Sequence, residues 1–381
     1  MSDVNPILVH VISSRSWGGV ENHALDICRT FLKRGWKVNA FTSDCRPIDN
    51  RFARAGIKVL HAPLNHSGLS TSFALRKFIR RHSEPIVIHV YDYKDAFWAL
   101  LARRLANRTR RQVKVVCTHH TCAPARKGWL MSRIYGGLDA FLFVSELSRR
   151  RFFESWDNRP LPFARERLFT LYPSLDIREV PDFTPISEKG PFILLYLGIL
   201  SREKGIELLI RTLPLLKGKR IRLSIVGTGK ADYIDYLHRL ADRLGVSTLI
   251  DWKGWKDSPY EAIREAHAGI SVCTKEEPFS RASLEIMASA RTQIVPCTGA
   301  LREYLKPIPA DELPEGISKE TDSVCLEDVT KEAIAKTCSW LAEHREVVAS
   351  LGIHSKINFT KLPSHHNMIL RLQRLYADSM V

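Results

Sequence analysis

The sequence has no long hydrophobic run and no N-terminal segment of the kind that begins a secretory signal. Residues 1–5 are polar, and the apolar run 7–12 is too short for the hydrophobic core of a signal peptide. No run approaches the roughly 18 apolar residues that cross a bilayer. We therefore expect no export by that route, no membrane span and a cytoplasmic location.

Closely spaced cysteines are also lacking. The chain has 8 cysteines, but none forms a CxxC pair and no spacing indicates a zinc site. Several lie in apolar runs, where a free cysteine behaves as a small hydrophobic residue. The pattern is typical of a reducing compartment and predicts free thiols and no metal. The cysteines are Cys28, Cys45, Cys117, Cys122, Cys273, Cys297, Cys325 and Cys338.

Two common nucleotide-binding fingerprints are missing. The glycine pair Gly18-Gly19 does not belong to a GxGxxG dinucleotide motif. The turn Gly227-Thr-Gly229-Lys230 lacks the remainder of a P-loop, so the sequence offers no case for a nucleotide triphosphatase.

Acidic residues are scarce in one half of the chain. Residues 1–185 carry 30 Lys and Arg against 16 Asp and Glu, a net charge of +14, whereas residues 186–381 carry 27 against 25, a net +2. The charge suits either a solvated basic surface or an anionic partner, and we expect an anionic membrane surface. No zinc finger, RNA-binding signature or aromatic-interleaved basic motif accompanies it, so we expect no nucleic-acid partner.

What the sequence does contain is a regular alternation of strand and helix patterns, which predicts parallel sheets covered by helices on both faces. The predicted strands are Ile7–Ile12, Trp36–Phe41, Ile57–His61, Ile86–Val90, Val113–Thr118, Ala140–Val144, Phe192–Leu197, Ile221–Val226, Leu249–Trp252, Gly269–Val272 and Gln293–Pro296. The predicted helices include Gly205–Leu216, Tyr233–Leu244, Ala282–Ala290 and Asn367–Met380.

A proline-rich stretch interrupts the alternation at residues 173–190 and predicts an interdomain linker. We therefore expect an N-terminal domain over residues 1–180 and a C-terminal domain over 190–365, both Rossmann-like and doubly wound, facing a central cleft. Ligands of such sheets bind beyond the carboxyl ends of the strands. Residues 307–316 are expected to form a loop.

The most specific segment is EPFSRASLE, which runs from Glu277 to Glu285 across a predicted loop-to-helix transition. A carboxylate can accept hydrogen bonds from two neighbouring hydroxyl groups, which suits a sugar or a ribose. The start of the helix offers free N–H groups to a phosphate. A surface loop followed by a surface helix would explain the same spacing.

Two further segments follow predicted strands. Gly198 to Gly205 places Arg202 and Lys204 at a strand's carboxyl end, where cations can neutralise a diphosphate, although a solvated loop fits as well. Gly18 and Gly19 open a helix and allow a ligand to approach the backbone, although a plain tight turn is the alternative.

A third segment, Thr118-His119-His120, ends another predicted strand. A histidine at a strand end can contact a ligand in the cleft, but it is often only structural. The sequence leaves open which of the two histidines faces the cleft.

Taken in this order, the segments resemble glycosyltransferase family 4, a family of retaining enzymes with the GT-B fold. The run Glu277 to Met287 is similar to that family's E-x7-E region, Gly198 to Gly205 to its phosphate loop, and Gly18, Gly19 and Glu21 to its GG.E turn. Residues 299–303 resemble its later GG..E turn, and residues 251–255 the strand and turn beside the nucleotide base.

The resemblance implies roles for individual residues. Glu285 would hold the ribose, Glu277 the donated sugar, and Lys204 the diphosphate with help from Arg202. His120, with Thr118 as its partner, matches the family's strand-end histidine near the reacting carbon. The backbone around Phe279, Ser280 and Arg281, and that of Gly18 and Gly19, would contact the sugar and phosphates. The last helix, 366–381, would pack back on the N-terminal domain.

Five positions depart from the family pattern, and those that replace glycine add side-chain atoms. Ile199 replaces an arginine, Ser280 a glycine, Ala290 a glycine and Ala300 a glycine. Thr292 also stands where the family has proline. The departures bear on activity and on the identity of the sugar rather than on the fold.

The reading that follows is a hexosyltransferase-type retaining glycosyltransferase. It would use a nucleotide diphosphate sugar as co-substrate, with no separate cofactor and no metal, and a saccharide or lipid-linked saccharide acceptor in cell-surface polysaccharide biosynthesis, peripheral on the inner face of the membrane. The alternatives are a sugar-nucleotide epimerase, which would release an altered nucleotide sugar, and a non-catalytic binding scaffold, which would bind without turnover.

Overall fold

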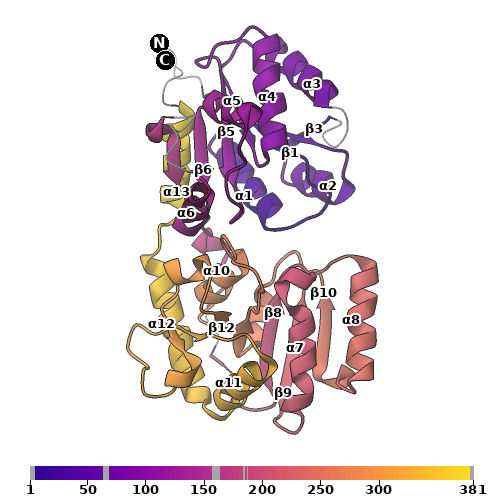
Figure 1. The fold of residues 1–381 in the computed structure, drawn as a ribbon, viewed down its shortest axis with the longest axis vertical. Coiled ribbons are helices and arrows are strands. Elements are labelled where there is room, and N and C mark those ends of the chain that lie inside the picture. The colour runs from indigo at the N-terminus through magenta and orange to yellow at the C-terminus, as the bar shows by residue number, and fades with distance from the viewer. Residues whose placement is uncertain (1–4, 63–67, 157–163, 183–184, 187, 378–381) are drawn as a thin grey trace. The chain divides into compact units, whose positions relative to one another are not determined.

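The computed structural model describes residues 5–62, 68–156, 164–182, 185–186 and 188–377, and the chain divides into two compact units. Unit 1 consists of residues 1–173 together with 366–381, and unit 2 of residues 174–365. Each unit contains a seven-stranded parallel sheet flanked by helices (Figure 1). The predicted α/β class with two Rossmann-like domains is therefore confirmed.

The sheet of unit 1 has the strand order β3-β2-β1-β4-β5-β6-β7. Its central strands are mostly apolar, and every residue of β1, β4 and β5 is buried, because helices cover both faces. The strands are β1 (Ile7–Ile12), β2 (Val38–Thr42), β3 (Lys58–His61), β4 (Ile86–Val90), β5 (Val113–His119), β6 (Ala140–Phe143) and β7 (Leu168–Thr170).

Seven helices belong to the described part of unit 1. They are α1 (Gly19–Lys33), α2 (Arg46–Arg54), α3 (Gly68–Arg81), α4 (Tyr93–Leu105), α5 (Trp129–Gly137), α6 (Glu146–Glu154) and α13 (His365–Ala377).

Helix α13 comes from the far end of the sequence and packs within unit 1. The Tyr376 hydroxyl lies 2.6 Å from Nδ1 of His89 on β4. The Lys114 ammonium of β5 donates to the carbonyls of Leu375 and Tyr376, at 3.0 and 3.2 Å. A cation at the last carbonyls of a helix is favoured by the helix dipole. Residues 378–380 of the helix predicted from the sequence lie outside the described residues.

The sheet of unit 2 repeats the same plan with the order β10-β9-β8-β11-β12-β14-β13. Its strands are β8 (Phe192–Leu197), β9 (Ile221–Val226), β10 (Ile250–Gly254), β11 (Ala268–Ile270), β12 (Thr292–Pro296), β13 (Pro307–Pro309) and β14 (Ser323–Leu326). Its helices are α7 (Ile206–Thr212), α8 (Ala231–Arg243), α9 (Tyr260–Glu265), α10 (Arg281–Ala288), α11 (Lys331–Glu343) and α12 (Arg345–Lys361).

Two elements of unit 2 differ from the sequence-based expectation because of proline. The helix expected over 205–216 ends at Thr212 and continues as a 3-10 helix that contains Pro214, since proline lacks the N–H of a helix interior. The loop expected over 307–316 begins instead with β13, whose two prolines occupy the outermost strand of the sheet. An edge strand tolerates proline because its outer N–H groups have no strand to pair with.

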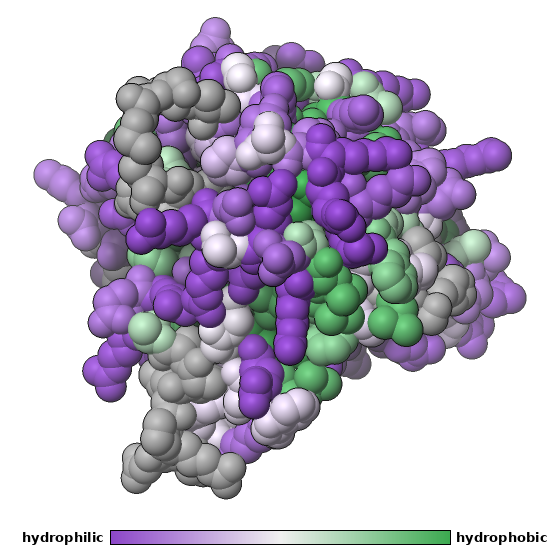
Figure 2. Space-filling model, turned by 90° about the horizontal axis from the view of Figure 1, so that it is seen from above, coloured by the Kyte–Doolittle hydropathy of each residue, from purple (hydrophilic) through white to green (hydrophobic). Residues whose placement is uncertain are grey.

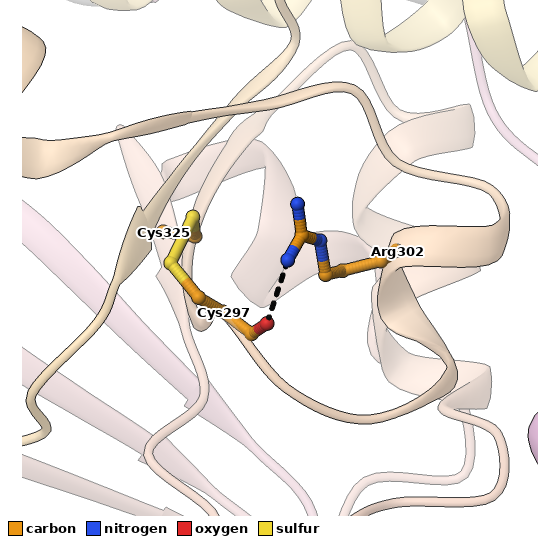
Figure 3. Close-up of a disulfide and its surroundings, with 3 residues drawn as sticks. All are labelled: Cys297, Arg302 and Cys325. Atoms are coloured by element: carbon orange, nitrogen blue, oxygen red, sulfur yellow. Dashed lines mark hydrogen bonds between the residues drawn. A yellow bond between two sulfur atoms is a disulfide. The ribbon is translucent and has the colours of Figure 1, made fainter.

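The expectation that all the cysteines are free is wrong for one pair. Cys297 and Cys325 form a disulfide with a Cα–Cα distance of 4.9 Å (Figure 3). Cys297 directly follows β12, and Cys325 lies in the neighbouring strand β14. Arg302 donates to the Cys297 carbonyl at 3.4 Å. The pairing depends on sheet order, which brings together two cysteines 28 residues apart.

Candidate functional site

The residues with the strongest chemical signal lie where the strand order of unit 2 reverses. Strands β8 and β11 are neighbours in the sheet but are separated in the sequence by β9 and β10. Lys204 follows β8, and Glu277 follows β11. Ligands of open α/β sheets bind at such a switch point, beyond the carboxyl ends of the strands.

Gly205 explains how Lys204 reaches this position. Its φ is +72°, and a Cβ atom there would lie 2.1 Å from the Val272 carbonyl oxygen. Only glycine allows this approach. The preceding turn is also hydrogen-bonded to the loop after β11, because the Thr274 amide donates to the Glu203 carbonyl at 3.0 Å. The loop after β8 and the loop after β11 are therefore packed together and hydrogen-bonded to each other.

Within this structure the Lys204 ammonium is paired with the Glu277 carboxylate. Glu277 is 7% exposed, and its second oxygen accepts from the Ser271 hydroxyl at 3.4 Å. Burial alone would lower the pKa of Lys204, but the charge and hydrogen bond of Glu277 raise it above its ordinary value. The lysine is therefore a permanent cation beside a buried carboxylate. No pattern in the local sequence marks Ser271 as part of this site.

The turn after β12 supports Glu277 from the other side. The Ala300 amide donates to the Glu277 carbonyl at 2.9 Å. Gly299 has a φ of +87°, and a Cβ atom there would lie 3.2 Å from the Glu277 amide nitrogen. The close contact is thus made by Gly299, and the departure at Ala300 leaves the backbone hydrogen bond in place.

Helix α10 begins directly beside this pair. Ser280 is its N-cap, and the Ser280 hydroxyl accepts from the Ser283 amide at 3.3 Å. The departure at Ser280 therefore supplies a standard helix cap. The Tyr304 hydroxyl bonds to the backbone of Ser280, and its ring lies 5.6 Å from that of Phe279. Tyr304 fixes the entrance to the helix, and nothing in its local sequence pattern marks it.

One turn into α10, Arg281 and Glu285 form a second ion pair. The Arg281 Nε donates to Glu285 at 2.9 Å, and Glu285 is 9% exposed. Glu285 thus already has a cationic partner, and a ribose would share the carboxylate with Arg281.

Arg202 and Ile199, by contrast, make no side-chain hydrogen bond or ion pair with these four residues within the described part of the chain. The Arg202 guanidinium lies over the rings of Tyr233 and Tyr236 of α8, at 5.6 and 5.7 Å from the ring centres. Ile199 is 36% exposed.

The remaining predicted residues lie in unit 1. Gly18 is the N-cap of α1, and around Gly19 a Cβ atom would meet nothing within 4 Å. The side of the helix start at Gly19 is therefore open. Glu21 is buried in the first turn, and burial raises the pKa of its carboxyl.

His120 directly follows β5, and its ring lies 5.5 Å from those of His23 of α1 and Tyr91. Its Nε2 is shielded from solvent and has no hydrogen-bond partner within the described residues. Burial, followed by the charges of His23 and His119, lowers the pKa of His120 well below its ordinary value. The residue is therefore a neutral imidazole with one free polar atom.

Both ring nitrogens of His119, in contrast, have hydrogen-bond partners, Tyr93 and Thr121. Its Nδ1 lies 2.6 Å from the Tyr93 hydroxyl and its Nε2 lies 3.2 Å from the Thr121 hydroxyl. Of the two histidines, His120 is the one available to a ligand. The sequence pattern does not single out His23, although this residue lies two positions after Glu21 in the same helix.

In the described part of the chain, the group able to hold a metal is Asp44, Asp49 and His61. Asp44 precedes α2, Asp49 lies on α2 and His61 on β3 of unit 1, and the group includes none of the predicted site residues. The described residues also include no helix that is both long and apolar enough to cross a bilayer.

Two protein-family models match this chain, one in its N-terminal half and one in its C-terminal half. Residues 17–176 match Glycosyltransferase Family 4, and residues 191–343 match Glycosyl transferases group 1. An uncharacterized glycosyltransferase of Methanocaldococcus jannaschii is 32% identical over 118 residues, which cover 30% of this chain and 29% of that protein. Soluble starch synthase 2-1 of rice (Oryza sativa) is 27% identical over 120 residues, 30% of this chain and 15% of that protein. The matched segments span less than a third of these relatives.

Solved structures match over almost the whole chain. HepE of Anabaena, in complex with UDP and glucose, superimposes with a TM-score of 0.77 at 15% identity, covering 97% of this chain and 99% of that one. Sucrose-phosphate synthase of Thermosynechococcus elongatus has a TM-score of 0.71 at 14% identity, covering 97% and 98%. These likenesses establish the shared fold. With the two family matches, they show that the chain belongs to the GT-B glycosyltransferases, with a family 4 domain followed by a group 1 domain.

Proposed function

We propose that this protein transfers a sugar from a nucleotide diphosphate sugar to a hydroxyl of a saccharide or lipid-linked saccharide, with retention of the anomeric configuration. The observation that carries the proposal is the Lys204–Glu277 pair at the switch point of unit 2, directly before α10. This arrangement places a fixed cation, a buried carboxylate and a helix start together, and these are the groups that a sugar diphosphate needs.

The donor would bind through unit 2. Lys204 and the first N–H groups of α10 would neutralise the diphosphate as it leaves, and Glu277 would accept from hydroxyl groups of the sugar. Glu285 would accept from the ribose, and Arg281 beside it would hold that carboxylate in place. Arg202 would act at longer range, from its position over the two tyrosines.

The acceptor would bind through unit 1, with Gly18, Gly19 and His120 also serving the donor. A neutral His120 can accept or donate one hydrogen bond at Nε2 without adding charge beside a developing oxocarbenium ion. The acceptor would attack on the face from which the diphosphate departs. The step needs no metal and no carboxylate nucleophile in this scheme.

The solved relatives support a uridine nucleotide as the first donor to test. HepE was crystallised with UDP and with UDP-glucose. TarM of Staphylococcus aureus was crystallised with UDP and α-GlcNAc-glycerol.

The basic charge of residues 1–185 supports an acceptor at an anionic membrane, as in cell-surface glycan synthesis. On the face shown in Figure 2, hydrophobic side chains reach the surface in a strip between hydrophilic ones. Trp129 of unit 1 is 73% exposed, and the Arg133 guanidinium lies 5.2 Å from its ring centre. Tryptophan beside a cation suits a membrane interface.

Liposome flotation tests the membrane part of the proposal. Vesicles with anionic lipid should carry the protein at low salt and release it as salt rises. Absence of binding at low salt would leave a soluble acceptor.

The donor part is tested by titrating the protein with UDP, GDP, ADP, CMP and dTDP sugars by calorimetry and thermal shift. One nucleotide class should bind preferentially, and Glu285→Ala should weaken that binding. Product analysis then separates transfer, which releases the nucleoside diphosphate, from epimerisation, which releases an altered nucleotide sugar. No binding to any nucleotide, with or without acceptor, would contradict the proposal.

A further inference from the structure

A pocket in unit 1 includes none of the residues assigned above to the transfer reaction. Its volume is about 680 Å³, within the range of small-molecule sites. It opens on the face of the sheet formed by β5, β6 and β7, and one wall is the last turns of α13. Nothing in the proposed transfer reaction uses it.

The floor of this pocket is apolar. Val116 of β5 is paired with Ala140 of β6, and Leu142 lies two residues further along β6, so the three side chains project from the same face of the sheet. Phe169, paired with Leu142, and then Leu171 continue this face to the edge of the sheet. Phe169 is 40% exposed. Val116, Ala140 and Leu142 are themselves at most 3% exposed, so the hydrocarbon that solvent can reach is that of Phe169 and the half-buried Leu171.

The deep polar groups around the floor are already satisfied. Lys114 donates to the end of α13. Asp139 accepts from Arg103 at 2.6 Å and from the Val115 amide at 2.8 Å. Arg167 donates to the Leu138 carbonyl at 3.4 Å.

Two guanidinium groups at the rim are different. Arg371 and Arg374 stand one turn apart on α13 and are exposed, and the structure gives them no hydrogen bond or ion pair with any described residue. Glu166 is the one carboxylate of the lining that has no ion pair within the described residues. The lining as a whole carries four cationic and two anionic side chains, so its net charge favours an anion.

We propose that this pocket binds an anionic amphiphile, a phosphate monoester with an alkyl chain. The chain would lie on Phe169, Leu171 and Leu375, and the phosphate would bind Arg371 and Arg374. Arginine suits phosphate because its planar group donates two parallel hydrogen bonds. The phosphate stays at the rim, where water still solvates it, so no charge is buried.

The probe for this proposal is decyl phosphate, titrated by calorimetry below its micelle concentration into the full-length protein. Decyl maltoside has the same chain without the charge, and inorganic phosphate has the charge without the chain. Decyl phosphate should bind at least about tenfold more tightly than either, since only it uses both halves of the pocket.

Variants locate the binding. The double variant Arg371→Glu/Arg374→Glu and the single variant Phe169→Asp should each weaken decyl phosphate binding by about tenfold or more. The matched control is Arg80→Glu/Arg81→Glu, which makes the same change of charge on an exposed part of α3 in the same unit. It should leave the affinity within about twofold. Melting curves verify that each variant is folded.

Three results would overturn the proposal: equal binding of decyl maltoside, equal binding of inorganic phosphate, or equal losses in the α3 control. Because the readout is binding to unit 1, failure here leaves the donor titration untouched. Failure of the donor site, in turn, leaves this pocket intact.

Discussion

At the scale of single residues, the Lys204–Glu277 pair has the most direct consequence for activity. We predict that Lys204→Ala lowers kcat by about a hundredfold or more, because in the proposed mechanism it removes the cation that neutralises the departing diphosphate. Steady-state assays of sugar transfer measure the effect. The protein should remain folded, because the side chain of Lys204 is 38% exposed.

The control for this variant is a lysine in the adjoining loop. Lys275 pairs with Glu203 at 2.6 Å and is exposed, so Lys275→Ala should retain transfer within about twofold, as expected for an exposed pair. A fully active Lys204→Ala protein would remove the proposed mechanism.

Ala290, which departs from the family pattern, lies away from the predicted ligand-binding end of α10. It lies beyond the C-terminal end of α10, whereas Glu277 precedes the N-terminal end. Its φ is +53°, in the left-handed region that favours glycine. The substitution therefore strains a helix end and does not crowd the predicted ligand.

We predict that Ala290→Gly raises the free energy of unfolding by about 0.5–1 kcal/mol. The left-handed conformation costs alanine about 1–2 kcal/mol, and the greater freedom of glycine in the unfolded chain offsets part of the gain. Urea denaturation measures it. Ala288→Gly, inside the same helix, should lower stability by about 1 kcal/mol or more, and the same sign for both variants would contradict the explanation.

At the scale of elements, the strands of unit 1 carry buried histidines. His10 of β1 is fully buried and lies 2.7 Å from the Tyr91 hydroxyl through its Nδ1. Burial lowers the pKa of His10 from 6.5 to about 3. Between these two values the unfolded chain binds a proton that the folded chain does not, so the free energy of unfolding falls as pH falls through this window.

We predict that His10→Gln reduces the loss of stability between about pH 7.5 and pH 5.5 by about 1.4 kcal/mol, the contribution of one such group. Urea titrations at both pH values measure it. His238→Gln, at an exposed position of α8, should leave the pH dependence unchanged. An unchanged dependence in His10→Gln would contradict the assignment.

The disulfide joins two neighbouring strands of unit 2. We predict that dithiothreitol lowers the free energy of unfolding of unit 2 by about 2–4 kcal/mol, as expected for a loop of this length. Cys297→Ser should show the lower stability and no further response to reductant. Cys122→Ser, which alters a cysteine outside this disulfide, should respond as the unchanged protein does.

The sequence predicted those elements whose signal is local. Strands β1, β4, β8 and β9 have the predicted bounds, since each is a short, mostly apolar segment between turns. The short strands β7 and β14 and the helices α11 and α12 were not predicted. β7 has only three residues, and helices stabilised by tertiary packing need not show a clear period.

The site was predictable only in part, because its contacts join residues that are far apart in the sequence. The chemistry of Lys204 and Glu277 could be read from their segments, but their pairing depends on the order of β8 and β11. The stacking of Arg202 on α8, the support from Tyr304 and the partner of Glu285 all come from side-chain packing. No spacing rule encodes these contacts.

At the scale of the whole molecule, α13 brings the C-terminal part of the described chain into unit 1. The Tyr376 hydroxyl and His89 are buried, and they are 287 residues apart in the sequence. We predict that Tyr376→Phe destabilises unit 1 by about 1–2 kcal/mol, because it leaves a buried imidazole nitrogen without its partner. Calorimetry should show this loss in the transition of unit 1.

The transition of unit 2 provides the reference. Tyr233→Phe removes a hydroxyl that has no hydrogen-bond partner within the described residues, so it should shift neither transition. A loss in both transitions for Tyr376→Phe would show that α13 does not act on unit 1 alone.

The return of α13 also sets an order of events during synthesis. The ribosome makes all of unit 2, residues 174–365, before it makes the helix that completes unit 1. At roughly 5–20 residues per second this interval lasts about 10–40 s. Throughout it, the rings of Phe31 and Trp36, which pack against Tyr376 in the finished protein, lack that cover. The half of the chain that is made first is therefore the half that finishes folding last, and a nascent chain halted within unit 2 should display this surface to chaperones.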